Sequence, residues 1–186
     1  MKIKERPYTS NGYMWTGVSA IFFSSCVTVS HSHNTMQLIF DIQDQFKCRI
    51  KNEPWRAYKN LIINENIIHQ LDTNSSVQLL IYLDVDTEIA RAIKKRFHLV
   101  DLYAPDLNIF DFVGVDELEK YLVNSDPAFL KILIQNILQK LSCEVIHQIE
   151  DERIWLVKRI IVLSDPHELS INFISSRVHL SQSKLR

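Results

Sequence analysis

The stretch "LIINENIIHQLDTNSSVQLLIYLD", residues 61–84, carries the pattern that decides the fold. It holds three short runs rich in Ile, Leu, Val and Tyr, and Asn, Asp and Ser separate them. Short apolar runs divided by turn-forming residues are typical of antiparallel strands. Similar runs precede it at 18–25, 36–42 and 46–50. Strands that recur about every eight to twelve residues predict a β-sandwich or β-barrel up to residue 83.

After residue 83 the apolar spacing changes from that of strands to that of helices. The clearest helix is 125–142, where Ser125 can act as the N-cap while Asp126 and Pro127 lie in the first turn. With the strands before them, the helices predict an α+β fold. The other segments with helical spacing are 86–97, 114–123, 151–163 and 169–178.

The composition is that of a folded globular protein. Of the 186 residues, 46% are hydrophobic and 23% are charged, which argues against disorder. The net charge of −1 excludes a polycation. Residues 151–186 nevertheless hold six Lys and Arg against four Asp and Glu, so the tail is mildly basic.

Cysteine use and the N-terminal segment both indicate the cytoplasm. Cys26, Cys48 and Cys143 are too few and too scattered for a disulfide framework or a zinc knuckle, so reduced thiols are expected. The apolar run near the N-terminus is interrupted by serines, and no small-residue cleavage site follows it. It is also too short and too polar to span a bilayer. We therefore expect a cytoplasmic protein without a membrane partner.

Two groups of motifs resemble AraC-type transcription regulators. "SHSHNTMQLIFDI" (30–42), "WRAYKNLIINENIIHQLD" (55–72) and "LLIYLDVDTE" (79–88) resemble the cupin-like sensor domain of that family. "DERIWLVKRI" (151–160) and "ELSINFISSRVHLSQSKLR" (168–186) resemble the start of its DNA-binding domain. The two groups occur in the family's order.

The resemblance implies a domain organisation and a function. It implies a cupin-like β-barrel, or jelly-roll, sensor over 1–83, a helical linker and dimerisation region over 84–145, and an incomplete DNA-binding domain over 146–186. A small effector in the barrel would change the affinity of a homodimer for DNA. No arrangement of acid, base and nucleophile is visible, so we expect no enzyme. The alternative is a stand-alone cupin, either a metal enzyme or a metabolite-binding module.

The tail ends within the first helix-turn-helix unit that the resemblance implies. A recognition helix would begin after Ser181, which is well placed as its N-cap. The family has two such units, so this chain alone is not expected to read DNA specifically. The structural alternative is an ordinary helical hairpin with a Ser cap. The residues that could contact DNA are Ser181, Gln182, Ser183, Lys184 and Arg186.

The histidines suggest a pocket inside the barrel. His31, His33 and Gln37 are spaced to face the same side of a strand, and His69 would come from a later strand. Cupin metal sites use H-x-H, a Glu four residues on and a later His, but Gln37 stands where the Glu would be. We therefore expect no metal or other cofactor, and we favour residues that pack, form hydrogen bonds or line a small-molecule pocket. A metal site at the three histidines is the weaker alternative.

Two aromatic residues have two open interpretations. Trp55 and Tyr58, in "PWRAYKN", could line the mouth of the barrel as a wall for the ligand. They could equally be aromatic residues of the outer face, packed on a helix.

The long helix also has two interpretations. Its apolar stripe could cover the open side of the barrel, or it could pair with its copy in a second subunit. We favour dimerisation, which would set the spacing of two DNA modules. The stripe consists of Leu130, Leu133, Ile134, Ile137, Leu138 and Leu141.

Overall fold

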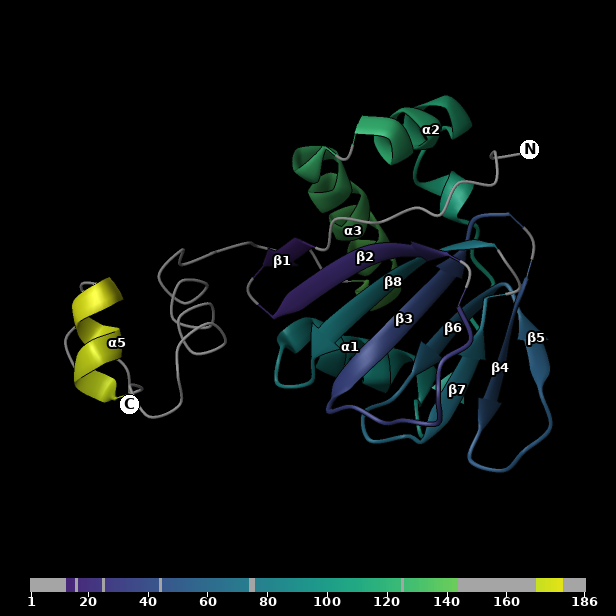
Figure 1. Ribbon diagram of the computed structural model, residues 1–186, viewed down its shortest axis with the longest axis horizontal. Coiled ribbons are helices and arrows are strands. Elements are labelled where there is room, and N and C mark those ends of the chain that lie inside the picture. The colour runs from purple at the N-terminus through teal and green to yellow at the C-terminus, as the bar shows by residue number, and fades with distance from the viewer. Residues whose placement is uncertain are drawn as a thin grey trace. The chain divides into compact units, whose positions relative to one another are not determined.

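The computed structural model describes residues 13–15, 17–24, 26–43, 45–73, 76–124, 126–143 and 170–178. The chain divides into two compact units, Met1–Ile146 and His147–Arg186 (Figure 1). The strands of the first unit are β1 (Tyr13–Trp15), β2 (Val18–Ser24), β3 (Thr35–Asp41), β4 (Phe46–Ile50), β5 (Arg56–Tyr58), β6 (Asn60–Ile63), β7 (His69–Asp72), β8 (Val77–Asp84) and β9 (Leu102–Tyr103). Its helices are α1 (Glu88–Phe97), η1 (Ile109–Asp111), α2 (Val115–Asn124) and α3 (Pro127–Ser142), and the second unit contains α5 (Ile171–Val178).

The strands form a jelly roll of two antiparallel sheets. The sheet orders are β1-β2-β8-β3-β6-β9 and β5-β4-β7. Residues 26–31 extend the smaller sheet, because Val27 and His31 form bridges to Asp72 and His69 of β7. Strands of the first half thus pair with those of the second half in reverse order: β4 with β5, β3 with β6, 26–31 with β7, and β2 with β8. A long hairpin rolled up in this way is the jelly roll that cupins share, and it confirms the predicted cupin-like α+β fold.

The central strand β8 is buried on both of its faces. Leu79, Ile81 and Leu83 belong to the hydrophobic core that the sheet shares with the helices. Leu80 points the other way and joins the core between the two sheets. An antiparallel sheet often leaves one face in water, whereas the helices here cover that face (Figure 1). The predicted boundary at residue 83 lies at the end of β8, but β9 follows it in the chain, and the helices share one core with the strands.

The helix starts are set by side-chain caps. Asp126 rather than Ser125 is the N-cap of α3, because its carboxylate accepts a hydrogen bond from the Ala128 N–H at 2.9 Å. Pro127 then occupies the first turn, where a missing N–H costs nothing. Thr87 caps α1 in the same way through its hydroxyl, which accepts from the Ala90 N–H. The helices predicted at 86–97, 114–123 and 125–142 are confirmed as α1, α2 and α3.

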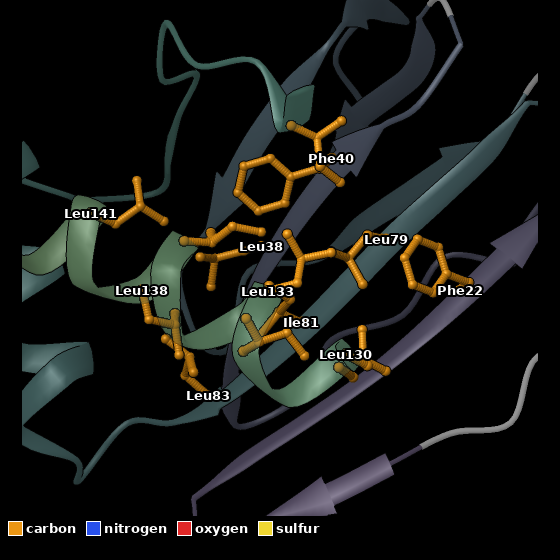
Figure 2. Packing of buried hydrophobic residues seen from close by; sticks show 14 of the residues in the cluster. Phe22, Leu38, Phe40, Leu79, Ile81, Leu83, Leu130, Leu133, Leu138 and Leu141 are labelled. Carbon is orange, nitrogen blue, oxygen red and sulfur yellow. The ribbon is translucent and has the colours of Figure 1, made fainter. Parts of the chain in front are cut away.

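The apolar stripe of α3 packs inside its own subunit. Its side chains point toward those of β2, β3 and β8 in Figure 2. They are at most 2% exposed, so they are not available to a second subunit. This corrects the dimerisation residues predicted from the sequence, because the stripe covers the sheet instead. The residues concerned are Leu130, Leu133, Ile134, Ile137, Leu138 and Leu141.

The second unit is described through α5. Ser170 caps this helix, since its hydroxyl accepts a hydrogen bond from the Phe173 N–H at 3.1 Å, and the helix predicted at 169–178 is confirmed. None of the helices in the described part of the chain has the length and hydropathy needed to cross a bilayer. The helix predicted at 151–163 lies outside the described residues, as do the predicted DNA contacts Ser181, Gln182, Ser183, Lys184 and Arg186.

Candidate functional site

Three histidines meet between the segment 26–31 and β7. His31 and His69 face each other across a bridge in which each N–H donates to the other's carbonyl oxygen, at 3.1 and 2.9 Å. Their ring centroids lie 4.4 Å apart. His33 brings its ring to 5.2 Å from that of His69. The structure therefore confirms that His31, His33 and His69 lie together, as their spacing predicted.

Backbone carbonyls fix the orientation of all three rings. The Nδ1 of His31 donates to the Val29 oxygen at 2.8 Å, and the Nδ1 of His69 donates to the Ile67 oxygen at 2.8 Å. His33 places its Nδ1 2.9 Å from the Thr35 carbonyl oxygen. A carbonyl oxygen can only accept, so the Nδ1 of His31 and that of His69 carry a proton, whereas the Nδ1 of His33 also lies 3.1 Å from the Thr35 hydroxyl, which can donate to it. The nitrogen that remains for other partners on each ring is Nε2.

Gln37 links the histidine cluster to β8. Its Oε1 lies 3.1 Å from His33 Nε2, and its Nε2 donates to the Tyr82 hydroxyl oxygen at 3.2 Å. In this arrangement His33 Nε2 donates to Gln37 Oε1, and the Thr35 hydroxyl can donate to His33 Nδ1 at 3.1 Å. With the amide turned by 180°, Gln37 donates to a neutral His33 and Tyr82 donates to Gln37. In both arrangements the three side chains form one polar chain.

His69 has the most perturbed acid–base chemistry of the cluster. The side chain is 1% exposed, and its Nε2 has no hydrogen-bond partner among the described residues. The pKa of His69 is lowered to about 4, mainly by burial and in part by the neighbouring His31 and His33, against the hydrogen bond to Ile67. The ring is therefore neutral at pH 7 and offers an acceptor nitrogen.

A partly enclosed cavity of about 160 Å³ lies between the two sheets. A cavity of about 150 Å³ with apolar walls binds benzene or xenon, so this volume suits a molecule of single-ring size. Its wall is mostly apolar, with polar groups from strands that lie far apart in the sequence. The lining residues are Ile21, Phe23, Thr28, His31, Gln37, Ile39, Phe46, Leu71, Thr73, Gln78, Leu80 and Tyr82.

A buried polar network lies beside the cavity. The Asp41 carboxylate accepts from the Ser76 hydroxyl at 2.7 Å, from the Gln43 N–H at 2.8 Å and from Gln78 Nε2 at 2.9 Å. Gln78 Nε2 also donates to the Thr73 carbonyl oxygen at 3.2 Å. Gln78 Oε1, by contrast, is buried without a partner among the described residues. One residue of the cavity wall, Gln78, therefore has an amide oxygen whose hydrogen-bonding capacity is unused among the described residues.

The three imidazoles fit a metal ion. One ring nitrogen from each lies within 4.8 Å of the other two, and none of the described carboxylates joins the cluster. An ion about 2.1 Å from each nitrogen would hold the three ligand atoms about 3.4 Å apart, so the rings would have to move closer together. The unpartnered Nε2 of His69 suits this role, and carbonyl partners on the opposite nitrogens are typical of metal-binding histidines. Coordination by His33 would replace its contact with Gln37.

Trp55 and Tyr58 are not part of the cavity wall. Trp55 is 38% exposed, and the Arg49 guanidinium lies 5.0 Å from its ring centroid. Tyr58 packs beside Phe46, with ring centroids 6.2 Å apart. The interpretation of these two residues as a ligand wall is therefore corrected. Trp55 is exposed, as the outer-face interpretation expected. It contacts Arg49, however, and not a helix.

Sequence reasoning missed the polar residues of the cavity on β8 and its neighbours. Gln78 and Tyr82 are the polar positions of an otherwise apolar run, "VQLLIYLD", and this was the available signal. Thr28 and Thr73 carried no comparable signal, because their roles depend on which strands pair.

A second hollow lies on the surface of the first unit. It measures about 750 Å³ and is more open than the barrel cavity. None of its side chains is among those with a buried unpartnered polar atom. The barrel cavity is therefore the stronger candidate site. The surface hollow is lined by Leu107, Asp111, Phe112, Asn136, Gln139, Lys140 and Cys143.

Comparisons with known proteins give fold likenesses only. No protein-family model matches the chain, and no curated protein matches it. Among solved structures, the AraC-like transcriptional activator CuxR shares 9% identity at a TM-score of 0.49, over 95% of this chain and 71% of that one. An RmlC-like cupin from Methanocaldococcus jannaschii shares 12% identity at a TM-score of 0.35, over 44% and 86%. A cupin-2 domain protein from Shewanella frigidimarina shares 8% at 0.36, over 45% and 86%. At these values the likenesses carry no argument alone, and the fold assignment rests on the strand order.

Proposed function

We propose that the jelly roll is the effector-sensing domain of an AraC-type transcription regulator. The observation that carries this proposal is the partly enclosed cavity, which combines an apolar wall with buried polar groups. Small-molecule sites have this composition. The resemblance of the tail motifs to the start of a DNA-binding domain supports the second half of the proposal.

β8 gives the cavity a route to the helices. Leu80 lines the cavity, while Ile81 packs in the same core as Leu133 of α3. An effector that favours one position of β8 would therefore favour one position of α3. It would regulate only if it bound one arrangement of the protein more tightly than the other. The preference of the effector for one arrangement would then change the affinity of the protein for DNA.

The proposal includes a homodimer in the cytoplasm. Two copies would present two DNA-binding modules at a fixed spacing, which a repeated DNA site can match. Because the stripe of α3 is buried, the contact between subunits would use another surface. The protein would act without catalysing a reaction.

Transcript profiling tests the proposal. The gene is deleted in its source organism and returned as the wild type, as Leu80→Trp, which fills the cavity, or as Ile132→Trp. Ile132 lies on α3 and is 59% exposed, so it serves as the surface control. We expect a small set of transcripts that change on deletion, that recover with the wild type and the control, and that respond differently to Leu80→Trp. The proposal fails if deletion changes no transcript reproducibly.

The second candidate is a metal-binding cupin, and the histidine cluster favours it. His31, His33 and His69 would hold the ion through Nε2. A bound metal of this kind polarises a carbonyl group or activates a water molecule. His69 is already neutral, as a ligand must be, and Gln37 is placed to contact a molecule beside the ion.

Metal analysis separates the two candidates. The protein is purified without chelators, and its metal content is measured for the wild type, His69→Asn and His98→Asn. His98 lies at the exposed C-terminal end of α1 and makes a matched control. About one ion per chain in the wild type and the control, and none in His69→Asn, would support the second candidate. A metal-free wild type would remove it.

A further inference from the structure

The amide of Gln78 has a fixed orientation. Its side chain is 1% exposed, and its nitrogen donates both to Asp41 Oδ2 at 2.9 Å and to the Thr73 carbonyl oxygen at 3.2 Å. Both partners can only accept, so the nitrogen and the oxygen of the amide cannot exchange places. Oε1 is left as a buried acceptor without a partner among the described residues. A buried acceptor of this kind costs free energy that a donor in the cavity would recover.

The surroundings of Gln78 disfavour a charged ligand. The Asp41 carboxylate lies directly behind the amide and repels an anion, and no Lys or Arg lines the cavity. The same carboxylate accepts hydrogen bonds from Ser76, Gln43 and Gln78 and is not among the residues that line the cavity, so a cation in the cavity would not pair with it directly. A charged group in this apolar space would lose its hydration without compensation.

The spacing along β8 sets the shape of the ligand. Gln78 and Tyr82 lie on the same face of the strand, four residues or about 13 Å apart. Leu80 lies between them, with Ile39 and Leu71 also in the wall. The cavity thus has an apolar middle, with Gln78 toward one end and Tyr82 and His31 toward the other.

We propose that the effector of this cavity is a small uncharged molecule, with an apolar body of single-ring size and a hydroxyl group that donates to Gln78 Oε1. This inference rests on the proposed function, because it takes the cavity as the effector site. It adds the chemical class of the effector.

Four probes of nearly equal size test this class. Benzyl alcohol, toluene, benzoate and benzylammonium are titrated into the 186-residue chain, and binding is followed by nuclear magnetic resonance. Benzyl alcohol is expected to bind about threefold to tenfold more tightly than toluene, the effect of one additional hydrogen bond. Benzoate and benzylammonium are expected to bind more weakly than either.

A variant pair assigns the preference to one atom. Gln78→Leu is expected to bind benzyl alcohol and toluene equally, because it removes the acceptor and keeps an apolar side chain. Gln45→Leu makes the same change at an exposed position and is expected to keep the preference. If Gln78→Leu does not fold, the order of the four binding affinities measured on the wild type still tests the ligand class.

Three results would overturn the inference: toluene binding as tightly as benzyl alcohol, either ion binding more tightly than benzyl alcohol, or no probe binding at all. Transcript profiling judges the proposed function separately. Regulated transcripts together with the wrong probe order would refute only the ligand class. The expected probe order without any regulated transcript would refute only the regulator.

Discussion

Leu80 and Ile81 are consecutive residues of β8 that face opposite sides of the sheet. Leu80 lines the cavity inside the barrel, and Ile81 packs in the core that the sheet shares with α3. One strand therefore separates the ligand-sized space from the helices. Any change in the cavity that displaces β8 reaches the helical layer without an intermediate element.

The core between β8 and α3 should dominate the stability of the first unit. Ile81 is fully buried, so Ile81→Ala is expected to lower the free energy of unfolding by about 3 kcal/mol, through lost burial and the remaining cavity. Ile132→Ala makes the same change on the exposed face of α3 and is expected to alter it by less than about 0.5 kcal/mol. Urea unfolding followed by circular dichroism measures both. Equal losses would contradict this packing.

His69 should make stability depend on pH. Its pKa in the folded protein is about 4, below the ordinary 6.5, so the unfolded chain binds the proton more readily between these values. The contribution of His69 to the free energy of unfolding is therefore complete above pH 6.5. It decreases as the pH falls toward 4, by at most about 1.4 kcal/mol per pH unit.

Unfolding of the metal-free protein between pH 4 and 7.5 tests this dependence. His69→Asn is expected to show a flatter profile than the wild type. His98→Asn should keep the wild-type profile, since His98 is exposed at a left-handed position that Asn tolerates. Identical profiles for all three proteins would show that His69 is not buried in the neutral form.

The buried carboxylate of Asp41 should depend on its hydroxyl donor. Ser76→Ala removes the hydrogen bond from Ser76 Oγ and leaves a buried charge with one fewer partner. A loss of about 1–3 kcal/mol in the free energy of unfolding is expected. Ser30→Ala, at an exposed position, is the matched control and should have almost no effect. If Ser76→Ala left the free energy of unfolding unchanged, a water molecule would have replaced the hydroxyl as the donor to Asp41.

Local patterns in the sequence revealed the strands, the helices and part of the site. The short apolar runs separated by turn residues predicted a sandwich or barrel, and the H-x-H of His31 and His33 suggested histidines inside it. The stripe of α3 showed that one face is buried, but not whether a sheet or a second subunit covers it. Gln78 was missed because its role depends on its pairing with Asp41, 37 residues away. Such contacts follow from strand register, which no local pattern contains.

Xenon binding followed by methyl resonances shows whether the barrel holds a ligand-sized cavity that is coupled to the helices. Xenon enters apolar cavities of about this volume. We expect a saturable shift of the Ile39 methyl in the cavity wall, a smaller shift of Ile81 beneath α3, and no shift of the exposed Ile132. An Ile39 methyl that responds no more than that of Ile132 would show that the barrel interior is filled, and would contradict a ligand-sized cavity there.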